Sequence, residues 1–352
     1  MNYYDSLDDL IKAYFKILSN DFPVWLNDYI NTKEMLRIGG TSLSCGVCYS
    51  GLFKQDYFYS NLDHSVGVAL IIWNFTHDKK ASLAGLFHDI ANPSFKHSID
   101  FMNGDYKKQE STEKRTVSII KNSKEIVDLL KRDNINIEDV IDYKMYPIAD
   151  NKAPKLSADR LEYNFSSGLT FKKIWTLDDI KKIYNDLTVV KNEDNILELA
   201  FKTYDICEYY VLNASLLWQL WISDEDKIVM QFIGDICKYM NNKGYLKIDD
   251  LYTLSEKDII NIILNSNDKY LIKAFNNLLN VNKVYISNIK VFNKYVVSIN
   301  PKLRYVTPLV IINNKIKRID KVSIKVNNRI NNLKKLSSDK HFTYFDFNFI
   351  SN

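Results

Sequence analysis

The chain contains five histidines, and four of them fall between residues 64 and 97 among carboxylates. His64 directly follows Asp63, and His88 directly precedes Asp89 at the end of an apolar run. Borderline divalent metals accept imidazole nitrogen and carboxylate oxygen together. His64, His88 and Asp89 are therefore three candidate ligands for one divalent ion.

The adjacency of His88 and Asp89 requires a helix end, since neighbours on a regular helix point about 100° apart. Pro93 predicts that end, because proline disfavours the helical conformation at Asn92. Asp159 is the candidate fourth ligand. It falls among inward-facing apolar positions of a predicted helix, where a buried carboxylate needs a cation.

The elements that must position these residues are mostly helical. Apolar residues recur at three and four positions from Leu7 to about Leu279. The pattern predicts helices over 108–132, 154–168, 177–187, 193–222, 224–241 and 257–279. Beyond residue 281, short β-branched and aromatic runs such as 295–299, 306–312 and 322–326 predict a small antiparallel sheet or ribbon. We therefore expect a mainly α fold with a small C-terminal α+β or β-ribbon lobe.

Composition and charge suggest how this chain of 352 residues is divided. With 46% hydrophobic and 26% charged residues, it is neither disordered nor fibrous. Residues 281–340 hold 14 Lys or Arg and two Asp, a local balance of +12 in a chain of net charge +4. This segment is either a solvated ribbon whose lysines protect a sheet edge or a contact surface for a polyanion. The expected units are an N-terminal segment at 1–55, a catalytic core at 56–170, a helical extension at 171–280 and a basic β-rich lobe at 281–352.

The order His64, His88-Asp89, Asp159 resembles the H…HD…D signature of the HD-domain phosphohydrolase superfamily. The segments HDIANPSFKH and SADRLEY are similar to those of its deoxynucleoside triphosphate triphosphohydrolase branch, and the resemblance spans about residues 55–170. It implies an HD-domain helical bundle in which His64, His88, Asp89 and Asp159 hold one divalent ion (Mn, Fe, Ni, Co, Zn or Mg). No histidine lies between His97 and His341, so we expect a mononuclear site.

The resemblance also implies roles around the ion. His97 matches a histidine that contacts phosphate or donates a proton, and Glu110 matches an acid that orients a histidine or a water. Asp89 takes part in catalysis as well as in metal binding, and Tyr163 lines the substrate pocket. Asn92 stands where the branch has a phosphate-contacting histidine, and it is a candidate substrate-binding residue. A second such histidine is replaced by Gln109, an expected Arg by Asn61, and an Arg-Asp pair by Ser166-Ser167.

Three further motifs carry weaker signals. Arg37 precedes Gly39-Gly40, and a glycine loop with an arginine can cradle phosphate, so Arg37 is a candidate substrate-binding residue. His77-Asp78 is a second HD dipeptide, but its polar surroundings predict an exposed connection between helices. The lone C-x-x-C at 45–48 is interpreted as incidental thiols, because a zinc knuckle needs a second pair.

We expect a cytoplasmic hydrolase that cleaves a nucleotide phosphoester or phosphoanhydride, with deoxynucleoside triphosphates as leading substrates and monophosphates next. Neither a membrane-spanning run nor a secretory signal is predicted. The expected partners are the nucleotide and, by resemblance, further copies of the chain. Two alternatives stay open: a catalytically reduced nucleotide sensor or nucleic-acid-binding module, and a phosphodiesterase acting on cyclic nucleotides or single-stranded nucleic acid.

Overall fold

The computed structural model describes residues 3–109, 111, 115–300, 302–338 and 341–349. Its larger apolar core surrounds helix α5 (Asn61–Thr76), which is buried continuously from its first residue to Ile72. A capping box between Ser60 and Asp63 starts α5. Two further helices pack on it: α6 (Lys79–Phe87), capped by Asp78, and α10 (Ala158–Thr170), capped by Ser157. These three helices position the predicted metal ligands.

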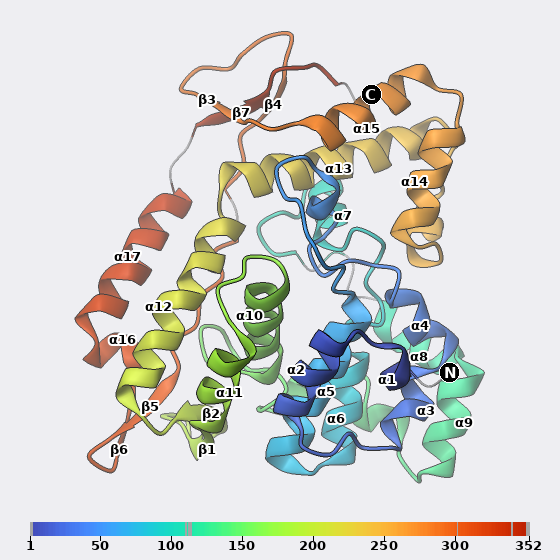
Figure 1. The fold of residues 1–352 in the computed structure, drawn as a ribbon. Helices are drawn as coiled ribbons and strands as arrows, with labels where there is room; N and C mark the ends of the chain where they lie inside the picture. The colour runs from blue at the N-terminus through green and yellow to red at the C-terminus, as the bar shows by residue number, and fades with distance from the viewer. Residues whose placement is uncertain (1–2, 110, 112–114, 301, 339–340, 350–352) are drawn as a thin grey trace.

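Further helices complete this larger core (Figure 1). They are α1 (Tyr3–Ser6), α2 (Asp9–Leu18), α3 (Leu26–Ile30), α4 (Lys33–Ile38), α8 (Thr116–Asn122), α9 (Lys124–Arg132), α11 (Leu177–Asn185) and α12 (Tyr204–Trp221), with the 3₁₀ turns Ile137–Asp139 and Tyr143–Met145. The predicted helix over 108–132 is therefore split, with α8 and α9 meeting at Ser123. The side chain of Ser123 caps α9 by accepting a hydrogen bond from Ile126 N.

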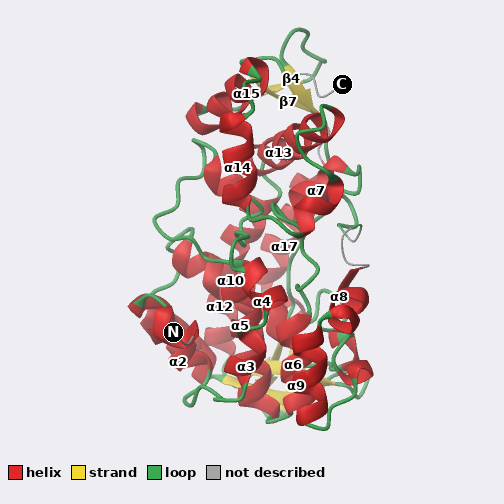
Figure 2. Ribbon diagram, turned by 90° about the vertical axis from the view of Figure 1, so that its right-hand side faces the viewer, coloured by secondary structure: helices red, strands yellow, loops and turns green. Residues whose placement is uncertain are grey.

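A second, smaller core lies around α13 (Asp224–Asn242), in the upper part of the molecule in Figure 1. Its other elements are α7 (His97–Met102), α14 (Glu256–Asn265), α15 (Lys269–Asn280) and the 3₁₀ turns Val47–Tyr49 and Ile248–Tyr252. An antiparallel sheet of order β3-β7-β4 covers α13, with β3 at Tyr285–Ser287, β4 at Tyr295–Val297 and β7 at Phe342–Phe345. Figure 2 shows α13, α14 and α15 above the helices of the larger core.

A four-stranded sheet of order β1-β2-β5-β6 contradicts part of the helical prediction. Its strands are β1 (Leu187–Lys191), β2 (Leu197–Phe201), β5 (Leu309–Ile312) and β6 (Lys315–Arg318). The predicted helix over 193–222 is wrong at β2, which pairs in parallel with β5. Glu198 is fully buried there against Arg318, at 2.5 Å. The strand conformation of β2 depends on partners more than 100 residues away in the sequence. Local periodicity contains no information about such partners.

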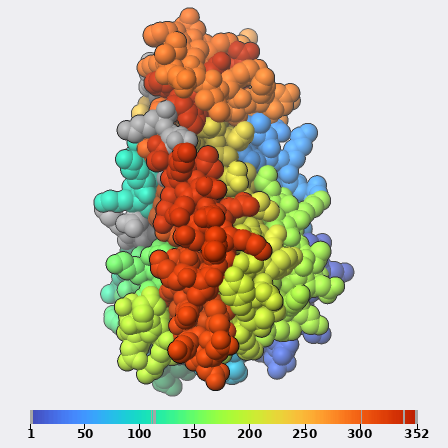
Figure 3. Space-filling model, turned by 90° about the vertical axis from the view of Figure 1, so that its left-hand side faces the viewer, coloured from blue at the N-terminus to red at the C-terminus, as the bar shows by residue number. Residues whose placement is uncertain are grey.

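The strand predicted over 322–326 is also wrong. Ile319–Val322 forms α16, and Ile324–Ser338 forms α17, whose side chains Val326, Ile330 and Leu333 are buried at helical spacing. Ser323 starts α17 by accepting a hydrogen bond from Val326 N at 3.1 Å. Figure 3 shows this segment as a long ridge on one side of the molecule.

The predicted fold class, mainly α with a small C-terminal β component, is confirmed. The segment expected to form one basic lobe, 281–352, contributes to both cores. Residues of β5, α16 and α17 join the larger core, whereas those of β4 and β7 join the smaller one. The chain between them, around residues 302–305, lies against the cavity described below.

Candidate metal centre and its cavity

Three of the four predicted ligands, His64, His88 and Asp89, bring ligand atoms within 4.8 Å of one another, and Asp159 lies beside both imidazole rings. The Nε2 atoms of His64 and His88 lie 3.2 Å apart. Asp159 Oδ1 is 3.2 Å from His64 Nε2 and 3.7 Å from His88 Nε2. Asp89 brings Oδ2 to 3.8 Å from His64 Nε2 and Oδ1 to 3.6 Å from His88 Nε2. Four side chains from three parts of the sequence thus face one small volume.

The donor set fits a divalent cation. His88 Nδ1 donates to the carbonyl oxygen of Gly85 at 2.6 Å, so its Nε2 carries a lone pair in the neutral ring. His64 Nε2 faces the same point, and two carboxylates complete the surroundings. Burial opposes ionisation of Asp159, but its contact with His64 lowers the Asp159 pKa to about 2. With both rings neutral, two Nε2 lone pairs and two carboxylates face one another, and this donor set suits a divalent cation.

Glu162 orients His64, a relationship that the sequence analysis missed. Its buried carboxylate makes a short hydrogen bond to His64 Nδ1 and accepts hydrogen bonds from Tyr59 (2.7 Å) and Tyr14 (3.1 Å). Burial opposes protonation of His64, but Glu162 and Asp159 together outweigh burial and raise the His64 pKa to about 9. Gly67 permits this contact, since a Cβ there would lie 2.7 Å from Glu162 Oε1.

The end of α6 brings His88 and Asp89 to the same point, as predicted. The helix ends at Phe87, several residues before Pro93, and tight turns follow. Ile90 N donates to Phe87 O at 3.0 Å, and Asn92 N donates to Asp89 O at 2.9 Å. Since the chain leaves regular helical geometry here, neighbouring side chains can face one ion.

Lys96 is a second residue that the sequence analysis missed. It is 5% exposed, and its Nζ lies 3.0 Å from Asp89 Oδ2 and 2.5 Å from Asn61 Oδ1. Burial opposes ionisation of Asp89, but His88 and Lys96 hold the Asp89 pKa well below its usual range. Lys96 has φ +41° and the preceding Phe95 has φ +65°. Two consecutive residues in this disfavoured region mark a loop that the surrounding structure holds in place.

His97 begins α7 on the opposite wall. Its Nδ1 lies 2.9 Å from Oδ2 of the fully buried Asp100, and its Nε2 lies 3.2 Å from Arg304 Nη2. An arginine can only donate, so these contacts place the proton of neutral His97 on Nδ1 and leave Nε2 as an acceptor. Burial lowers the pKa of His97, with Asp100 opposing this effect.

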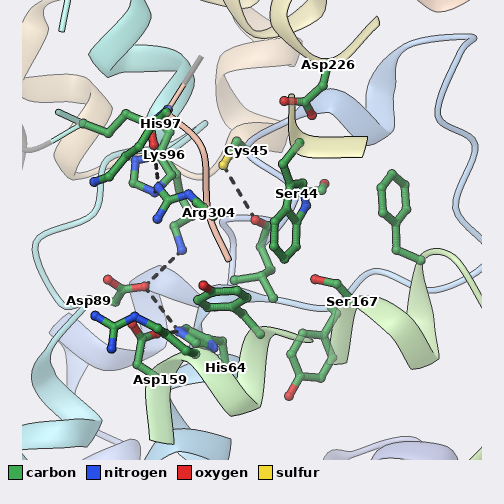
Figure 4. Close-up of a pocket in the computed structure, with 18 of the residues that line it drawn as sticks. Ser44, Cys45, His64, Asp89, Lys96, His97, Asp159, Ser167, Asp226 and Arg304 are labelled. Atoms are coloured by element: carbon green, nitrogen blue, oxygen red, sulfur yellow. Dashed lines mark hydrogen bonds and ion pairs between the residues drawn. The ribbon is translucent and has the colours of Figure 1, made fainter. Parts of the chain in front are cut away.

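These groups line one cavity of about 450 Å³ between the two cores (Figure 4). The predicted residue Tyr163 is on its wall, with its ring centroid 5.2 Å from that of Trp221. Burial raises the pKa of Tyr163 to about 12. Aromatic rings form much of the remaining lining, which includes Tyr59, Tyr143, Phe171 and Tyr305.

Two of the predicted substrate-binding residues lie behind the cavity wall. Arg37 Nη2 donates to the carbonyl oxygens of Ile90 (2.8 Å) and Asn92 (2.9 Å), so Arg37 holds the backbone of the loop after Asp89. Neither Arg37 nor Asn92 is among the lining residues. Glu110 lies outside the described residues, while the preceding Gln109 does line the cavity.

The second HD dipeptide and the C-x-x-C motif both lie within the described residues. His77 ends α5 with φ +51°, and Asp78 caps α6, so this second HD dipeptide is the exposed connection predicted. Cys45 and Cys48 are free thiols. Lys302 and Arg304 of the basic segment line the cavity. Neither the solvated-ribbon interpretation nor the polyanion-surface interpretation of that segment placed them there.

Comparisons with known proteins agree with this arrangement. Residues 61–159, which span all four predicted ligands, match the HD domain family. A metal-dependent phosphohydrolase of Cordyceps militaris is 24% identical over 162 residues, covering 46% of this chain and 45% of that protein. An uncharacterized protein of Mycoplasma genitalium is 24% identical over 241 residues, covering 61% and 56%. The chain spans about half the length of the curated relatives it matches.

Two solved structures share the fold over nearly the whole chain. A phosphohydrolase from Bacteroides thetaiotaomicron superposes with a TM-score of 0.63 at 15% identity, covering 92% of this chain and 96% of that one. A hypothetical protein from Aquifex aeolicus gives the same TM-score and identity, with 93% of each chain covered. Within the described residues, no helix combines the length and apolar character needed to cross a membrane.

Proposed function

The chain belongs to the HD-domain superfamily, and on this premise we propose that it is a metal-dependent phosphohydrolase acting on a nucleotide phosphoester or phosphoanhydride. One observation carries the proposal: two imidazole Nε2 atoms 3.2 Å apart, facing two carboxylates at the wall of a cavity. Imidazole nitrogen and carboxylate oxygen together form a donor set that borderline divalent metals accept.

In this proposal His64, His88, Asp89 and Asp159 hold one divalent ion. An ion held by these residues would supply Lewis-acid chemistry, activating water and neutralising charge on a phosphoryl oxygen. Glu162 and the Gly85 carbonyl keep the two imidazole rings oriented. Mn, Fe, Ni, Co, Zn and Mg all remain candidate ions.

Two further side chains of the cavity act on the phosphate group: Lys96, beside Asp89, and His97, on the opposite wall. Lys96 Nζ, fixed beside Asp89, faces the cavity as a buried cation and stabilises charge on a phosphoryl oxygen. On the opposite wall, neutral His97 accepts a proton at Nε2, while Asp100 keeps the imidazole oriented through Nδ1. Both assignments extend the chemistry beyond the four ligands.

The aromatic lining supports a nucleotide. A cavity with Tyr163, Trp221 and Tyr305 in its wall offers faces on which a base can stack, in addition to the cations that receive phosphate. Deoxynucleoside triphosphates are the leading substrates and monophosphates the next, as expected from the sequence.

The test is elemental analysis of purified protein combined with a phosphate-release screen over nucleotides with Mn²⁺, Mg²⁺, Co²⁺ and Ni²⁺. We expect about one ion per chain and turnover that chelation abolishes. Orthophosphate, triphosphate or a monoester product identifies the bond cleaved and separates this proposal from phosphodiesterase activity. One bound ion without turnover on any nucleotide would favour the sensing or binding alternative.

The ligand assignment has its own test. Asp159→Ala should lose the ion, because it removes one of the two carboxylates that face both imidazole Nε2 atoms, at 3.2 Å from His64 and 3.7 Å from His88. Asp150→Ala is the matched control, since Asp150 also lines the cavity but pairs with Arg160 at 2.9 Å. Full retention of the ion by Asp159→Ala would contradict the four-ligand site.

A further inference from the structure

One cation of the cavity comes from far outside the HD domain. Arg304 lies in the basic C-terminal segment, yet its Nη2 is 2.5 Å from Gln109 Oε1 and 3.2 Å from His97 Nε2. Gln109 is buried, and its backbone adopts φ +58°. The guanidinium is therefore held at a defined place on the cavity wall by two neutral acceptors.

Within the described residues, the charge of Arg304 has no contacting counterion, unlike that of two neighbouring cations. Lys96 pairs with Asp89 at 3.0 Å, and Arg160 pairs with Asp150 at 2.9 Å. No carboxylate of the described residues comes within 4.0 Å of an Arg304 nitrogen. A partly buried guanidinium bonded only to neutral groups retains free N–H donors and unneutralised charge, which are the requirements for binding an oxyanion.

The position of Arg304 relative to the metal ligands determines which oxyanion it meets. Figure 4 shows the Lys96 amine between Asp89 and the Arg304 guanidinium. A phosphoryl group at the metal centre therefore meets Lys96 first. Arg304 lies beyond Lys96 along the cavity. It is therefore available to bind a different group of the same molecule.

We propose that Arg304 binds a second anionic group of the substrate, a phosphoryl or carboxylate group carried by the molecule whose phosphoryl group lies at the metal centre. This inference rests on the proposed function and narrows its substrate class to phosphorylated compounds with a second oxyanion. It also gives the basic segment a role in the cavity, through Arg304, in addition to its exposed lysines.

Three small probes test this without turnover: methylphosphonate, phosphonoacetate and methylenediphosphonate. They share one phosphonate and differ in carrying no second anion, a carboxylate or a second phosphonate. Calorimetric titration of the protein as purified should show tighter binding of at least one two-anion probe. Arg304→Gln should reduce that preference about tenfold to a hundredfold, the effect of losing a charged hydrogen bond. Metal content should not change.

Lys317→Gln is the charge-matched control, because Lys317 is an exposed lysine of the same segment, on β6. It should keep the wild-type preference, and Arg304→Lys should keep only part of it. Equal affinity of the wild type for all three probes would overturn the inference, whatever the stability of the variants. So would an unchanged preference in Arg304→Gln.

The two proposals fail separately. An Arg304-dependent preference in a protein that hydrolyses no phosphorylated compound would refute the hydrolase and keep the anion site. Turnover in a protein whose probe preference does not depend on Arg304 would support the hydrolase and refute the anion site.

Discussion

Lys96 Nζ lies 3.0 Å from Asp89 Oδ2, so an ammonium group contacts a carboxylate that is also a predicted metal ligand. Asp89 therefore has two positively charged neighbours when an ion is present. The backbone holds Lys96 there against its conformational preference, at φ +41°. Glu256 supports the loop by accepting a hydrogen bond from Phe95 N at 3.2 Å. This arrangement keeps a cation at the cavity rather than in solvent.

Lys96→Gln should lower kcat about a hundredfold, as expected for removing one charged group that stabilises a transition state. The ion should stay bound, because all four proposed ligands remain. Steady-state kinetics and elemental analysis measure the two effects. Lys290→Gln, which removes an exposed lysine, should leave kcat unchanged. A wild-type kcat in Lys96→Gln would remove this residue from the mechanism.

Glu162→Gln should weaken metal binding about tenfold to a hundredfold, because an amide orients His64 without the negative charge that raises its basicity. Competition with a chelator of known affinity measures the change. Ser166→Ala is the control: it deletes a hydroxyl that contacts Glu162 at 3.2 Å and keeps the carboxylate. Equal affinities of wild type and Glu162→Gln would show that Glu162 only fills space.

His97→Ala should lower turnover by about 10² or more, the contribution typical of a positioned acid or base. Its metal content should equal that of the wild type, since His97 lies outside the ligand set. Asp100→Asn keeps the imidazole but alters its orienting partner, so its pH–rate profile should shift. An unchanged rate in His97→Ala would exclude proton transfer by this residue.

Glu256 makes stability depend on pH. Burial raises its pKa to about 7, against 4.5 for the ordinary carboxyl. Between these values folding takes up a proton, so unfolding free energy falls as pH rises through this window and is lowest above it. The loss is on the order of 3 kcal/mol. Glu256→Gln should flatten the dependence in denaturant titrations from pH 4.5 to 8.

Asp258→Asn is the matched control for that titration. Asp258 lies on the same helix, and its hydrogen bonds with Ser255 lower its pKa below 3.8. The stability it contributes is therefore lost only as pH falls below the window. The wild-type slope between pH 4.5 and 8 should persist in Asp258→Asn. A slope that also persists in Glu256→Gln would assign the dependence to another group.

The sequence by itself determined the four candidate ligands and the helical class. His64, His88, Asp89 and Asp159 are recognisable because residue type, order and apolar surroundings are local properties, and a helix end beside Pro93 is a local steric effect. The same local reasoning excluded His77-Asp78, whose neighbours are polar. Amphipathic periodicity located most helices for the same reason.

Tertiary structure alone decided the rest of the site. Glu162 reaches His64 across 98 residues, and Arg304 reaches His97 across 207. Neither pairing leaves a periodic trace, because a side chain's partner depends on how whole helices and strands pack. The parallel pairing of β2 with β5 has the same origin. The candidate ligands could be predicted from the sequence. The groups that orient them and bring positive charge to the cavity could be identified only from the tertiary structure.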